Sequence, residues 1–511
     1  MIYMKILTAN QTRRAEQNTF NIGISGERLM ENAGSAAARI ISRNFHLQNI
    51  RAVVVVGQGN NGGDGYVVAR KLKEYGAKVS VIMAMGFAMT RDSALMQKRA
   101  EQSQVPTLNY YDNKDLAENL IDTADIIVDA IFGIGFHGAA DREISVIIER
   151  INRSSAKKIA LDIPSGVIAD SGEVMGSAIK ANLTVSFIGY KPCHFEYPSN
   201  EYCGKTVAVS IGIEDKYIDE FSAEVIEPEN ALKMLKVIPR NAHKGTKGTA
   251  LIIGGCYGMV GAPMISAKAA MRSGVGIVKV CLPRTAYSAA APMLPEAVFV
   301  PTKDDLDYLS ADCISKDLFK NINSLLIGPG MSLNDLTVGA VIKAIAFSKV
   351  PTVIDADGLN ALSSNLEVLK EISVPLIVTP HPGEMSRLIG KSVDEIQKNR
   401  MSVALEFARE YGVITVLKGA YTVIALPDGK VYINTTGNEG MATAGSGDML
   451  AGMIAAFLAN GMDPTKAVVS AVSLHGAAGD RAAEKFGIRG LMVSDIIEQL
   501  HSLLNNALGD R

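Results

Sequence analysis

A strand that runs directly into a glycine-rich loop is the feature that most constrains the fold of this chain. The stretch VVVVGQGNNGGDGYVVARKL covers residues 53–72. Four consecutive valines are typical of a buried strand, and the glycines allow the chain to turn sharply into a helix whose first N–H groups can bind an anion. The pattern predicts a strand–loop–helix unit, with the helix over Tyr66–Tyr75, in an α/β domain built on a parallel sheet.

The glycines of this loop have the spacing of a dinucleotide-binding fingerprint. Gly57, Gly59 and Gly62 form the pattern G-x-G-x-x-G. A nicotinamide dehydrogenase usually also has Asp or Glu at the end of the second strand, where it binds the ribose. The second strand here ends in VSVIMAMG, which contains no acidic residue. The sequence therefore argues against a dehydrogenase, although the loop remains suited to a dinucleotide.

Polar residues follow this loop and the strands after it. Asp64 lies in what the pattern predicts to be the first turn of the helix, where a carboxylate gains about 0.3–1 kcal/mol from the helix dipole. Asp129 ends one later strand, Asp162 and Ser165 follow the next, and FIGYKPCHFEYPSN follows the one after that. Ligands bind beyond the carboxyl ends of parallel strands, so these stretches predict one site. Asn61, Asp129 and Ser165 could hold a cation, and one carboxylate with neutral partners suits a monovalent ion better than Mg²⁺.

The length of the chain, 511 residues, is too great for a single core and predicts two unlike α/β domains. We expect a first domain over residues 1–213, a linker over 214–226, where the sequence is acidic and weakly periodic, and a second domain over 227–511. The expected strands are Val53–Val56, Val79–Met83, Ile126–Asp129, Ile159–Asp162 and Leu183–Phe187, then Ala250–Ile253, Gly276–Val280, Leu325–Ile327, Thr352–Asp355, Leu376–Thr379 and Val413–Leu417. The main further helices are expected at Arg28–Ile41, Asp92–Gln102, Met449–Leu458, Pro464–Lys485 and Ser494–Leu504.

The composition of the chain argues against some classes of binding partner. The net charge is −2, without a strongly basic run, which argues against a nucleic-acid-binding protein. The five cysteines lack paired metal-ligand spacing, so we expect free thiols in a reducing compartment. The sequence shows no signal-peptide pattern and no apolar stretch long enough to span a membrane. We therefore expect a soluble cytoplasmic protein whose partners are small molecules, with no nucleic acid and no membrane.

In the second half, the stretch TAGSGDMLAGMIAAFLANG is the strongest local signal. Gly445, Ser446 and Gly447 precede a long apolar helix, and Asp448 lies in its first turn. Free N–H groups at this position can stabilise an anion or developing negative charge, and a neighbouring aspartate can take a proton from a hydroxyl. The arrangement resembles the ribokinase-like superfamily, whose members transfer a phosphoryl group to an alcohol.

The motifs of the first half, LMENAG, GNNGGDGYVVAR, VDAIFGIGFHG and LDIPSGV, occur in this order over about residues 8–212. They resemble the Rossmann-like epimerase domain that acts on hydrated NADH and NADPH. The resemblance implies that the catalytic residue Asp162 lies on the damaged nicotinamide ring and that K⁺ is held by Asn61, Asp129 and Ser165. It also implies a set of contacts to the hydrated dinucleotide: Asn60, Asn61, Gly62, Gly63, Asp64, Gly133, Ile134, Gly135, Phe136, His137, Gly138 and Ala139.

The second half, over about residues 225–508, contains KGTKGTALIIGG, LIGPGMS, VIDADGLNAL, VTPHPGEMSRL and VLKGAYTVI. These stretches are similar to the ADP- or ATP-dependent dehydratases that remove water from hydrated NAD(P)H, which have a ribokinase-like fold. The resemblance implies that the substrate contacts Ala262, Gly330, His381 and the catalytic residue Asp448. It implies that the nucleotide, with Mg²⁺ on its phosphates, is bound by Lys418, Gly419, Ala420, Tyr421, Thr422 and Gly447.

One position departs from the family pattern. Ser332 stands where the loop usually reads G-P-G-x-G, so a positive φ at this residue would carry a modest steric cost. His381 has a plainer interpretation as a hydrogen-bonding loop residue, and Asp355 and Asp357 could simply start a helix.

Taken together, the two resemblances imply one chain that interconverts the two epimers of the hydrate and dehydrates one of them, with ADP giving AMP and phosphate. The alternative is a ribokinase-like kinase of a small alcohol or a pyrimidine, joined to a non-catalytic binding domain. By analogy with ribokinase-like dehydratases, we expect a homo-oligomer.

Overall fold

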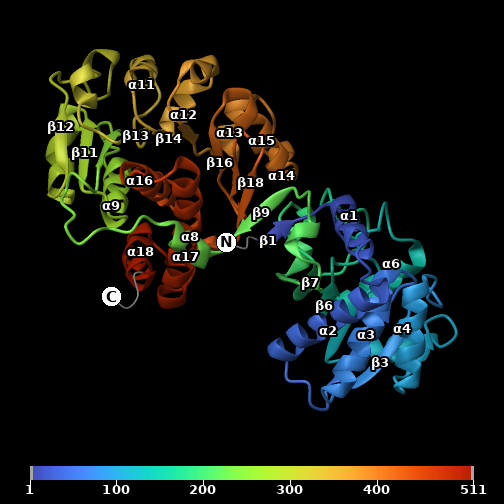
Figure 1. Ribbon diagram of the computed structural model, residues 1–511. Helices are drawn as coiled ribbons and strands as arrows, with labels where there is room; N and C mark the ends of the chain where they lie inside the picture. The colour runs from blue at the N-terminus through green and yellow to red at the C-terminus, as the bar shows by residue number, and fades with distance from the viewer. Residues whose placement is uncertain (1–3, 508–511) are drawn as a thin grey trace. The chain divides into compact units, whose positions relative to one another are not determined.

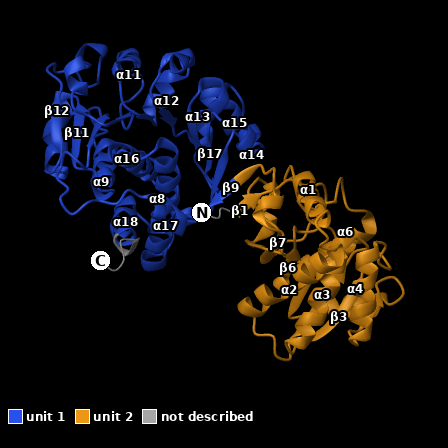
Figure 2. Cartoon of the chain, in the orientation of Figure 1, with its two compact units in different colours: residues 1–3, 224–511 blue, residues 4–223 orange. Residues whose placement is uncertain are grey.

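The computed structural model of the protein describes residues 4–507 and separates into two compact units (Figure 2). One unit consists of residues 4–223 and the other begins at Glu224. The outer ends of the two expected domains, residues 1–3 and 508–511, lie outside the described residues. Part of the expected linker has regular structure, because it contains the short helix η2 (Asp215–Tyr217) and the strand β9 (Ala223–Ile226).

The first unit contains a parallel sheet in the order β4-β3-β2-β5-β6-β7-β8. Figure 1 labels β3, β6 and β7 of this sheet. Its strands are β2 (Arg51–Val56), β3 (Lys78–Met83), β4 (Thr107–Asn109), β5 (Ile126–Ala130), β6 (Lys157–Leu161), β7 (Leu183–Phe187) and β8 (Lys205–Val209), and β1 (Met4–Ile6) precedes them. Its helices are α1 (Ala9–Phe20), α2 (Gly26–Asn44), α3 (Asn60–Glu74), α4 (Arg91–Gln102), α5 (Lys114–Thr123), α6 (Arg142–Arg153) and α7 (Asn200–Cys203).

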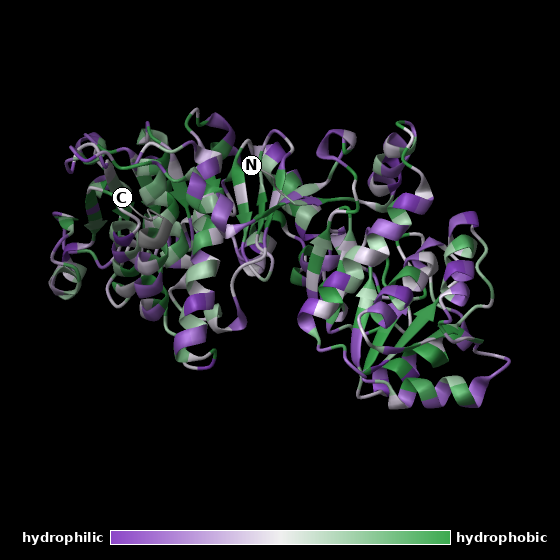
Figure 3. Cartoon of the chain, turned by 60° about the horizontal axis from the view of Figure 1, so that its bottom comes forward, coloured by the Kyte–Doolittle hydropathy of each residue, from purple (hydrophilic) through white to green (hydrophobic). Residues whose placement is uncertain are grey.

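Helices cover both faces of this sheet, and alternate valines of β2 pack against the two helical layers. Val54 and Val56 pack with residues of α2, α3 and α4, whereas Val53 and Val55 pack with residues of α5 and α6. Successive side chains of a strand point to opposite faces, so a strand between two helical layers must be apolar at every position. Figure 3 shows the result: the strands are apolar, and the helices around them carry both polar and apolar residues.

The second unit has a mixed sheet in the order β9-β18-β17-β16-β15-β14-β13-β10-β11-β12. Its pairs are parallel except at the turns that join β16, β17 and β18, which are antiparallel. The strands are β10 (Thr249–Ile253), β11 (Ile277–Leu282), β12 (Val298–Pro301), β13 (Ser324–Ile327), β14 (Thr352–Ile354), β15 (Leu376–Val378), β16 (Ile414–Leu417), β17 (Val423–Ala425) and β18 (Val431–Asn434).

The helices of the second unit are α8 (Pro228–Met234), α9 (Gly261–Arg272), α10 (Arg284–Ala290), α11 (Asp335–Phe347), α12 (Asp357–Leu362), α13 (Pro382–Ile389), α14 (Val393–Lys398), α15 (Arg400–Tyr411), α16 (Ser446–Ala459), α17 (Pro464–Phe486) and α18 (Val493–Ala507). Helix α16 is central, because every residue from Met449 to Ala459 is buried. A helix that is apolar on all sides is stable only inside a core. Its first turn, which includes Asp448, is thereby held at a defined position.

The predicted α/β class is confirmed in both units, and among the helix starts that of α3 differs most from the expectation. Helix α3 begins at Asn60, after Gly59 as its N-cap, and not at Tyr66. Asp64 therefore lies in the second turn, and the first turn contains no acidic residue. The glycines within the helix serve close packing: a Cβ on Gly65 would lie 2.7 Å from the Cβ of Ala130.

None of the described helices combines the length and the apolar character that crossing a bilayer requires. All five cysteines are free thiols, as the sequence predicted, and Cys193, Cys203, Cys256 and Cys281 are buried.

Candidate active sites

A cavity of about 890 Å³ opens at the carboxyl ends of the strands in the first unit. Its walls come from α1 and α2 and from the segments that follow β2, β3, β5, β6, β7 and β8. Most residues that the sequence predicted to contact a dinucleotide line this cavity: Asn60, Asn61, Asp64, Gly133, Ile134, Gly135, Phe136, His137, Ala139 and Asp162. The fold thus gathers segments that are distant in the sequence around one space.

Three predicted glycines do not line the cavity. Gly62 and Gly63 are buried within α3. An added Cβ would lie 2.1 Å from the carbonyl oxygen of Gly57 in the first case and 2.4 Å from the sulfur of Met30 in the second. Gly138 has a φ of 74°, which favours glycine and allows the loop after β5 to turn. These residues shape the site without lining it.

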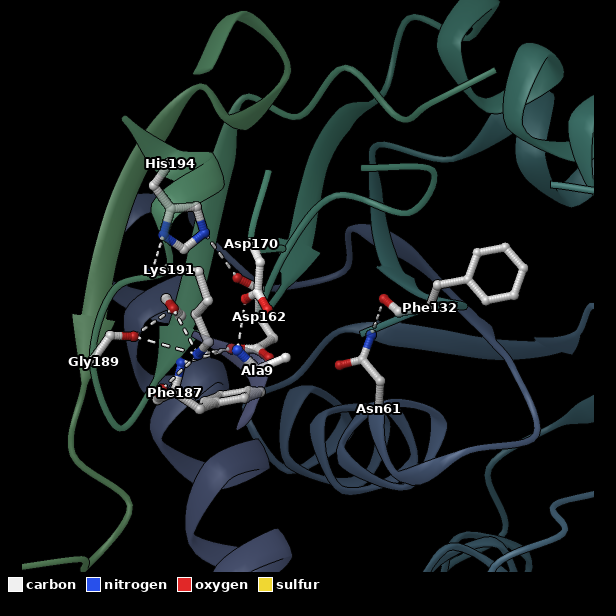
Figure 4. A network of polar contacts seen from close by, with 10 residues as sticks. Ala9, Asn61, Phe132, Asp162, Asp170, Phe187, Gly189, Lys191 and His194 are labelled. Atoms are coloured by element: carbon white, nitrogen blue, oxygen red, sulfur yellow. Dashed lines mark hydrogen bonds and ion pairs between the residues drawn. The ribbon is translucent and has the colours of Figure 1, made fainter. Parts of the chain in front are cut away.

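Asp162 follows β6 and forms an ion pair with Lys191, a residue that the sequence analysis did not select (Figure 4). Lys191 follows β7, and its side chain is fully buried. Its Nζ donates to the Asp162 carboxylate and also to the carbonyl oxygen of Phe187 at 2.8 Å. The backbone N–H of Phe187 donates to the same Asp162 carboxylate at 3.1 Å. Asp162 has a φ of 65°, a conformation that is uncommon for residues with a Cβ and often occurs at functional sites.

The side chain of His194 contacts the backbone of both residues of this ion pair. Its pKa is lowered to about 3, first by burial and then by the charge of Lys191, so the imidazole is neutral. Nδ1 accepts the backbone N–H of Lys191 at 3.0 Å, which leaves the proton on Nε2, and Nε2 lies 3.1 Å from the carbonyl oxygen of Asp162. A neutral histidine thereby ties the two backbone segments together.

Two further carboxyl groups line the same cavity. The pKa of Asp64 is raised well above its ordinary value, mainly by burial and then by the nearby Asp162 and Glu16. The pKa of Glu16, on α1, is raised by burial and by Asp162, against the opposing effect of Lys191 and Arg13. The cavity therefore contains carboxyl groups that favour the protonated form beside one that is paired with an ammonium group.

Beside the cavity lies the predicted cation site. Ser165 Oγ donates to Asp129 at 2.6 Å, and Ser165 N–H donates to its other carboxylate oxygen at 2.8 Å. Burial raises the pKa of Asp129 to about 6, even though Ser165 and Ile131 donate hydrogen bonds to it. The Asn61 amide donates to the Phe132 carbonyl at 2.7 Å, while its oxygen is buried without a hydrogen-bond partner.

These oxygens fit a monovalent cation. An unsatisfied buried amide oxygen and a buried carboxylate both gain from a positive charge placed between them. Among the described residues, no group of three or more His, Cys, Asp or Glu could hold a metal ion. Any ion at this position would therefore depend on neutral oxygen ligands, as Asn61 and Ser165 would provide.

In the second unit, Asp448 at the start of α16 lies in a cluster of charged side chains. Lys418 Nζ contacts Asp355 at 2.7 Å and Glu384 at 3.8 Å. Burial works against the charge of Lys418, but Asp355 and Glu384 together raise its pKa. The pKa of Asp448 is raised to about 7, first by burial and then by Asp355, while Lys418 opposes the shift. A carboxylate with this pKa is suited to accept a proton near neutral pH.

The predicted nucleotide loop begins at Lys418 and meets the start of α16. A Cβ on Gly447 would lie 3.2 Å from Lys418 Nζ, so a glycine allows this lysine to approach the helix. Gly419 and Ala420 are exposed, and Tyr421 has a φ of 55°. The hydroxyl of Thr422 donates to the Gly419 carbonyl at 3.0 Å and closes the loop.

The predicted substrate contacts of this unit surround the same cluster. Gly330 lies against Ala262 on α9, because a Cβ on Gly330 would be 3.2 Å from the Ala262 Cβ. His381 is the N-cap of α13: its Nδ1 accepts the N–H groups of Gly383 and Glu384 at 3.0 and 3.2 Å. The plainer interpretation of His381 as a hydrogen-bonding loop residue is therefore correct for Nδ1, and Nε2 of the half-exposed side chain lies 3.4 Å from Glu384 Oε1.

The loop that departs from the family pattern has the backbone that the sequence analysis considered. Ser332 has a φ of 63°, and its N–H donates to Asp357 at 2.8 Å. Ala356, next to Asp357, has a φ of 50°. Ser332 and Ala356 thus both have a positive φ and both lie beside Asp357. Such a backbone persists only where the surrounding structure holds it in place.

The fold and the sites together define a class of protein: a parallel Rossmann-like α/β domain joined to a ribokinase-like α/β domain. Residues 26–193 match the model of a family described as YjeF-related protein N-terminus, and residues 250–502 match the model of a family described as NAD(P)H-hydrate dehydratase. The bifunctional NAD(P)H-hydrate repair enzyme Nnr of Moorella thermoacetica is 38% identical, over 94% of this chain and 92% of that protein. The enzyme of the same description from Escherichia coli is 33% identical, over 98% and 94%.

The chain belongs to the family of bifunctional NAD(P)H-hydrate repair enzymes, as its motifs predicted. A solved structure of the ADP/ATP-dependent NAD(P)H-hydrate dehydratase from Bacillus subtilis, co-crystallised with ATP and Mg²⁺, is 33% identical. That match covers 55% of this chain and 97% of the solved chain, with a TM-score of 0.49.

Proposed function

We propose that this chain repairs hydrated NADH and NADPH in two steps. The first unit interconverts the R and S forms of the 6-hydroxy hydrate, and the second dehydrates the S form with cleavage of a nucleotide. The observation that carries the proposal is the convergence of the predicted contact residues on one cavity, in a chain that belongs to this family. We also propose a cytoplasmic location, as the sequence analysis expected.

In the proposed dehydration, hydroxide is a poor leaving group and phosphate a good one. Asp448 takes the proton of the 6-hydroxyl, which then accepts a phosphoryl group from the nucleotide. The N–H groups at Gly445–Gly447 and the ammonium of Lys418 stabilise the charge of the transferring group. Elimination of phosphate restores the reduced nicotinamide ring. We favour ADP as the donor, giving AMP and phosphate, with Mg²⁺ neutralising the charge of the nucleotide phosphates.

In the proposed epimerisation, the hydroxyl on carbon 6 leaves and returns to the opposite face of the ring. Asp162 is the carboxylate that handles the proton, and the cation site formed by Asn61, Asp129 and Ser165 holds K⁺. Full epimerase activity in an Asp162→Asn variant would rule out this role for Asp162.

The absorbance of the reduced nicotinamide ring tests the function as a whole. Hydrated NADH incubated with the protein, ADP and Mg²⁺ should regain this absorbance, and omission of the nucleotide should prevent it. An Asp448→Ala variant should lose dehydration by several orders of magnitude while retaining epimerisation. The alternative, a small-alcohol or pyrimidine kinase, predicts a stable phosphorylated product and no recovery of absorbance.

We also propose that the chain forms a homo-oligomer, by analogy with ribokinase-like dehydratases. Sedimentation of the purified protein measures its mass in solution, and a monomer over the working concentration range would contradict this proposal.

A further inference from the structure

The carboxyl groups that line the cavity of the first unit are of two kinds. Asp162 is held through one carboxylate oxygen, because Oδ1 accepts both from Lys191 and from the N–H of Phe187 and neither bond uses Oδ2. Asp64 and Glu16 line the same cavity, and neither side chain forms a hydrogen bond or ion pair with any residue in the described range 4–507. A carboxyl group kept free in a cavity between apolar elements remains available to a bound substrate.

We propose that Asp64 is the catalytic acid of the epimerisation, that Asp162 is its partner base, and that Lys191 is a positioning residue for Asp162. This inference rests on the proposed epimerase function and assigns the proton transfers within it. Asp64 lies on α3 and Asp162 follows β6, so the two carboxyl groups reach the cavity from different elements. A substrate ring between them would have an acid on one face and a base on the other.

The proton and electron balance of this scheme closes without a further reactant. Protonated Asp64 gives its proton to the 6-hydroxyl as the bond from carbon 6 to oxygen breaks, and water leaves. The lone pair of the ring nitrogen forms a double bond to carbon 6, so the ring becomes a cation beside two carboxylates. Water then adds to carbon 6 from the other face and gives a proton to Asp162. Proton exchange with solvent then returns Asp162 to the carboxylate and Asp64 to the acid, and the reverse conversion can run with the two residues in exchanged roles.

The lysine explains why the two carboxyl groups differ. Lys191 Nζ is surrounded by oxygen acceptors: the Asp162 carboxylate, the Ser186 hydroxyl at 3.2 Å, and the carbonyls of Phe187 at 2.8 Å and Gly189 at 3.4 Å. An ammonium in this position cannot move away from Asp162 without leaving buried acceptors unsatisfied. The ion pair fixes the position of the Asp162 carboxylate, whereas Asp64 has no cation in contact.

Asp64 is a better candidate for the acid than Glu16 for two reasons. It stands on the same helix as Asn60 and Asn61, which line the cavity with it, and α3 is held by close glycine packing. Its pKa is raised well above the ordinary range by burial and by the neighbouring carboxylates. Glu16 lies near Arg13, whose charge opposes the upward shift of its pKa.

The experiment measures the exchange of the two epimers by NMR over a range of pH, with uncatalysed exchange subtracted. The groups that face Asp64 are Glu16, Asp162 and Lys191. For the wild type we expect kcat/KM to fall at high pH as Asp64 loses its proton. Asp64→Asn should lower the rate by about 10²–10⁴-fold and remove the fall at high pH.

Glu16→Gln and Lys191→Gln are the comparison variants. Loss of the Glu16 charge should move the high-pH fall to lower pH but leave it present, because Glu16 raises the pKa of Asp64. Loss of Lys191 should lower kcat and leave the high-pH fall in place, and Lys191→Arg, which keeps a positive charge beside Asp162, should restore part of the rate. Dehydration of the pure S hydrate by the second unit of the same molecules serves as an internal activity control.

The outcomes separate the inference from the function on which it rests. If the wild type does not exchange the epimers at all, the proposed function fails. If the wild type does so and Asp64→Asn keeps its rate within a few-fold, or if Glu16→Gln is the variant that removes the fall at high pH, the assignment of Asp64 is wrong. If Asp64→Asn fails to fold by calorimetry, the Glu16→Gln profile decides: a shifted fall supports the assignment and an unshifted one overturns it.

Discussion

The dehydration rate should depend on pH through Asp448, and the cluster around this residue determines where. The pKa of Asp448 is about 7, raised first by burial and then by Asp355, with Lys418 opposing. As the base that takes the hydroxyl proton, Asp448 must be ionised. From one pH unit below this value to one unit above it, the ionised fraction rises from about 0.1 to about 0.9. We therefore expect kcat/KM for dehydration to rise about tenfold over this interval.

Two variants should move this rise in opposite directions. Asp355→Asn removes a neighbouring negative charge and also releases Lys418, which contacts Asp355 at 2.7 Å. Both effects lower the pKa of Asp448, so the rise should occur at lower pH. Lys418→Met removes the opposing positive charge, so the rise should occur at higher pH, in addition to weaker nucleotide binding.

Initial rates of absorbance recovery from the pure S hydrate, at fixed ADP and Mg²⁺, measure these profiles. Titration of the nucleotide phosphates is the same in all three proteins, so a difference between their profiles belongs to the protein. A rate that is flat or falls with rising pH over this interval would refute the role of Asp448 as the base. Shifts of both variants in the same direction would refute the electrostatic explanation.

Three further predictions concern ions and packing. K⁺ in place of tetramethylammonium should raise the unfolding temperature of the wild type in calorimetry. An ion present at about a hundred times its Kd adds about 2.7 kcal/mol to the free energy of unfolding. An equal rise in the Asp129→Asn variant would contradict the cation site. Ser332→Gly should stabilise the second unit by up to about 1 kcal/mol in urea unfolding, because it relieves a positive φ in a residue with a Cβ; a loss of stability would show that the Ser332 side chain makes a larger contribution. Gly65→Ala should destabilise the first unit by about 1–3 kcal/mol, because the added Cβ would lie 2.7 Å from the Cβ of Ala130. The same variant should impair epimerisation more than dehydration. Unchanged unfolding in urea would show that α3 can move away from the sheet.

The strands and the long helices could be predicted because burial leaves a clear pattern in the sequence. Strand β2 covers Arg51–Val56 where Val53–Val56 was expected, and α17 begins at Pro464 as predicted. Asp463 caps α17 and Gly487 ends it, which are local signals that need no tertiary information. Short strands such as β4 and β17, of three residues each, carry too few residues for such a pattern.

The start of α3 could not be predicted, because its glycines are required by tertiary packing and do not form a turn. A glycine run usually indicates a loop, but here Gly62, Gly63 and Gly65 lie in a helix that packs against the Gly57 backbone, α2 and the sheet. Tertiary packing overrides the low helix propensity of these residues. The same packing places Asp64 in the second turn and facing the cavity.

The role of Lys191 could not be predicted either. Lysine is normally exposed, and only the meeting of the segments after β6 and β7 buries its side chain against Asp162. The sequence signal was a polar stretch beyond a strand end, which indicated the region without indicating the residue. By contrast, Asn61, Asp129 and Ser165 were predicted from residue type and position, and hydrogen bonds and burial place them beside one another.

The most direct test of the account begins with the pure R hydrate of NADH, ADP and Mg²⁺, and follows both the epimers and the recovered NADH. The wild type should convert all of the R form to NADH, Asp448→Ala should produce S hydrate but no NADH, and Asp162→Asn should leave the R form unchanged beyond its uncatalysed exchange. Recovery of NADH from the R form at the wild-type rate by Asp162→Asn would contradict the central claim that each unit performs a separate step on the same damaged coenzyme.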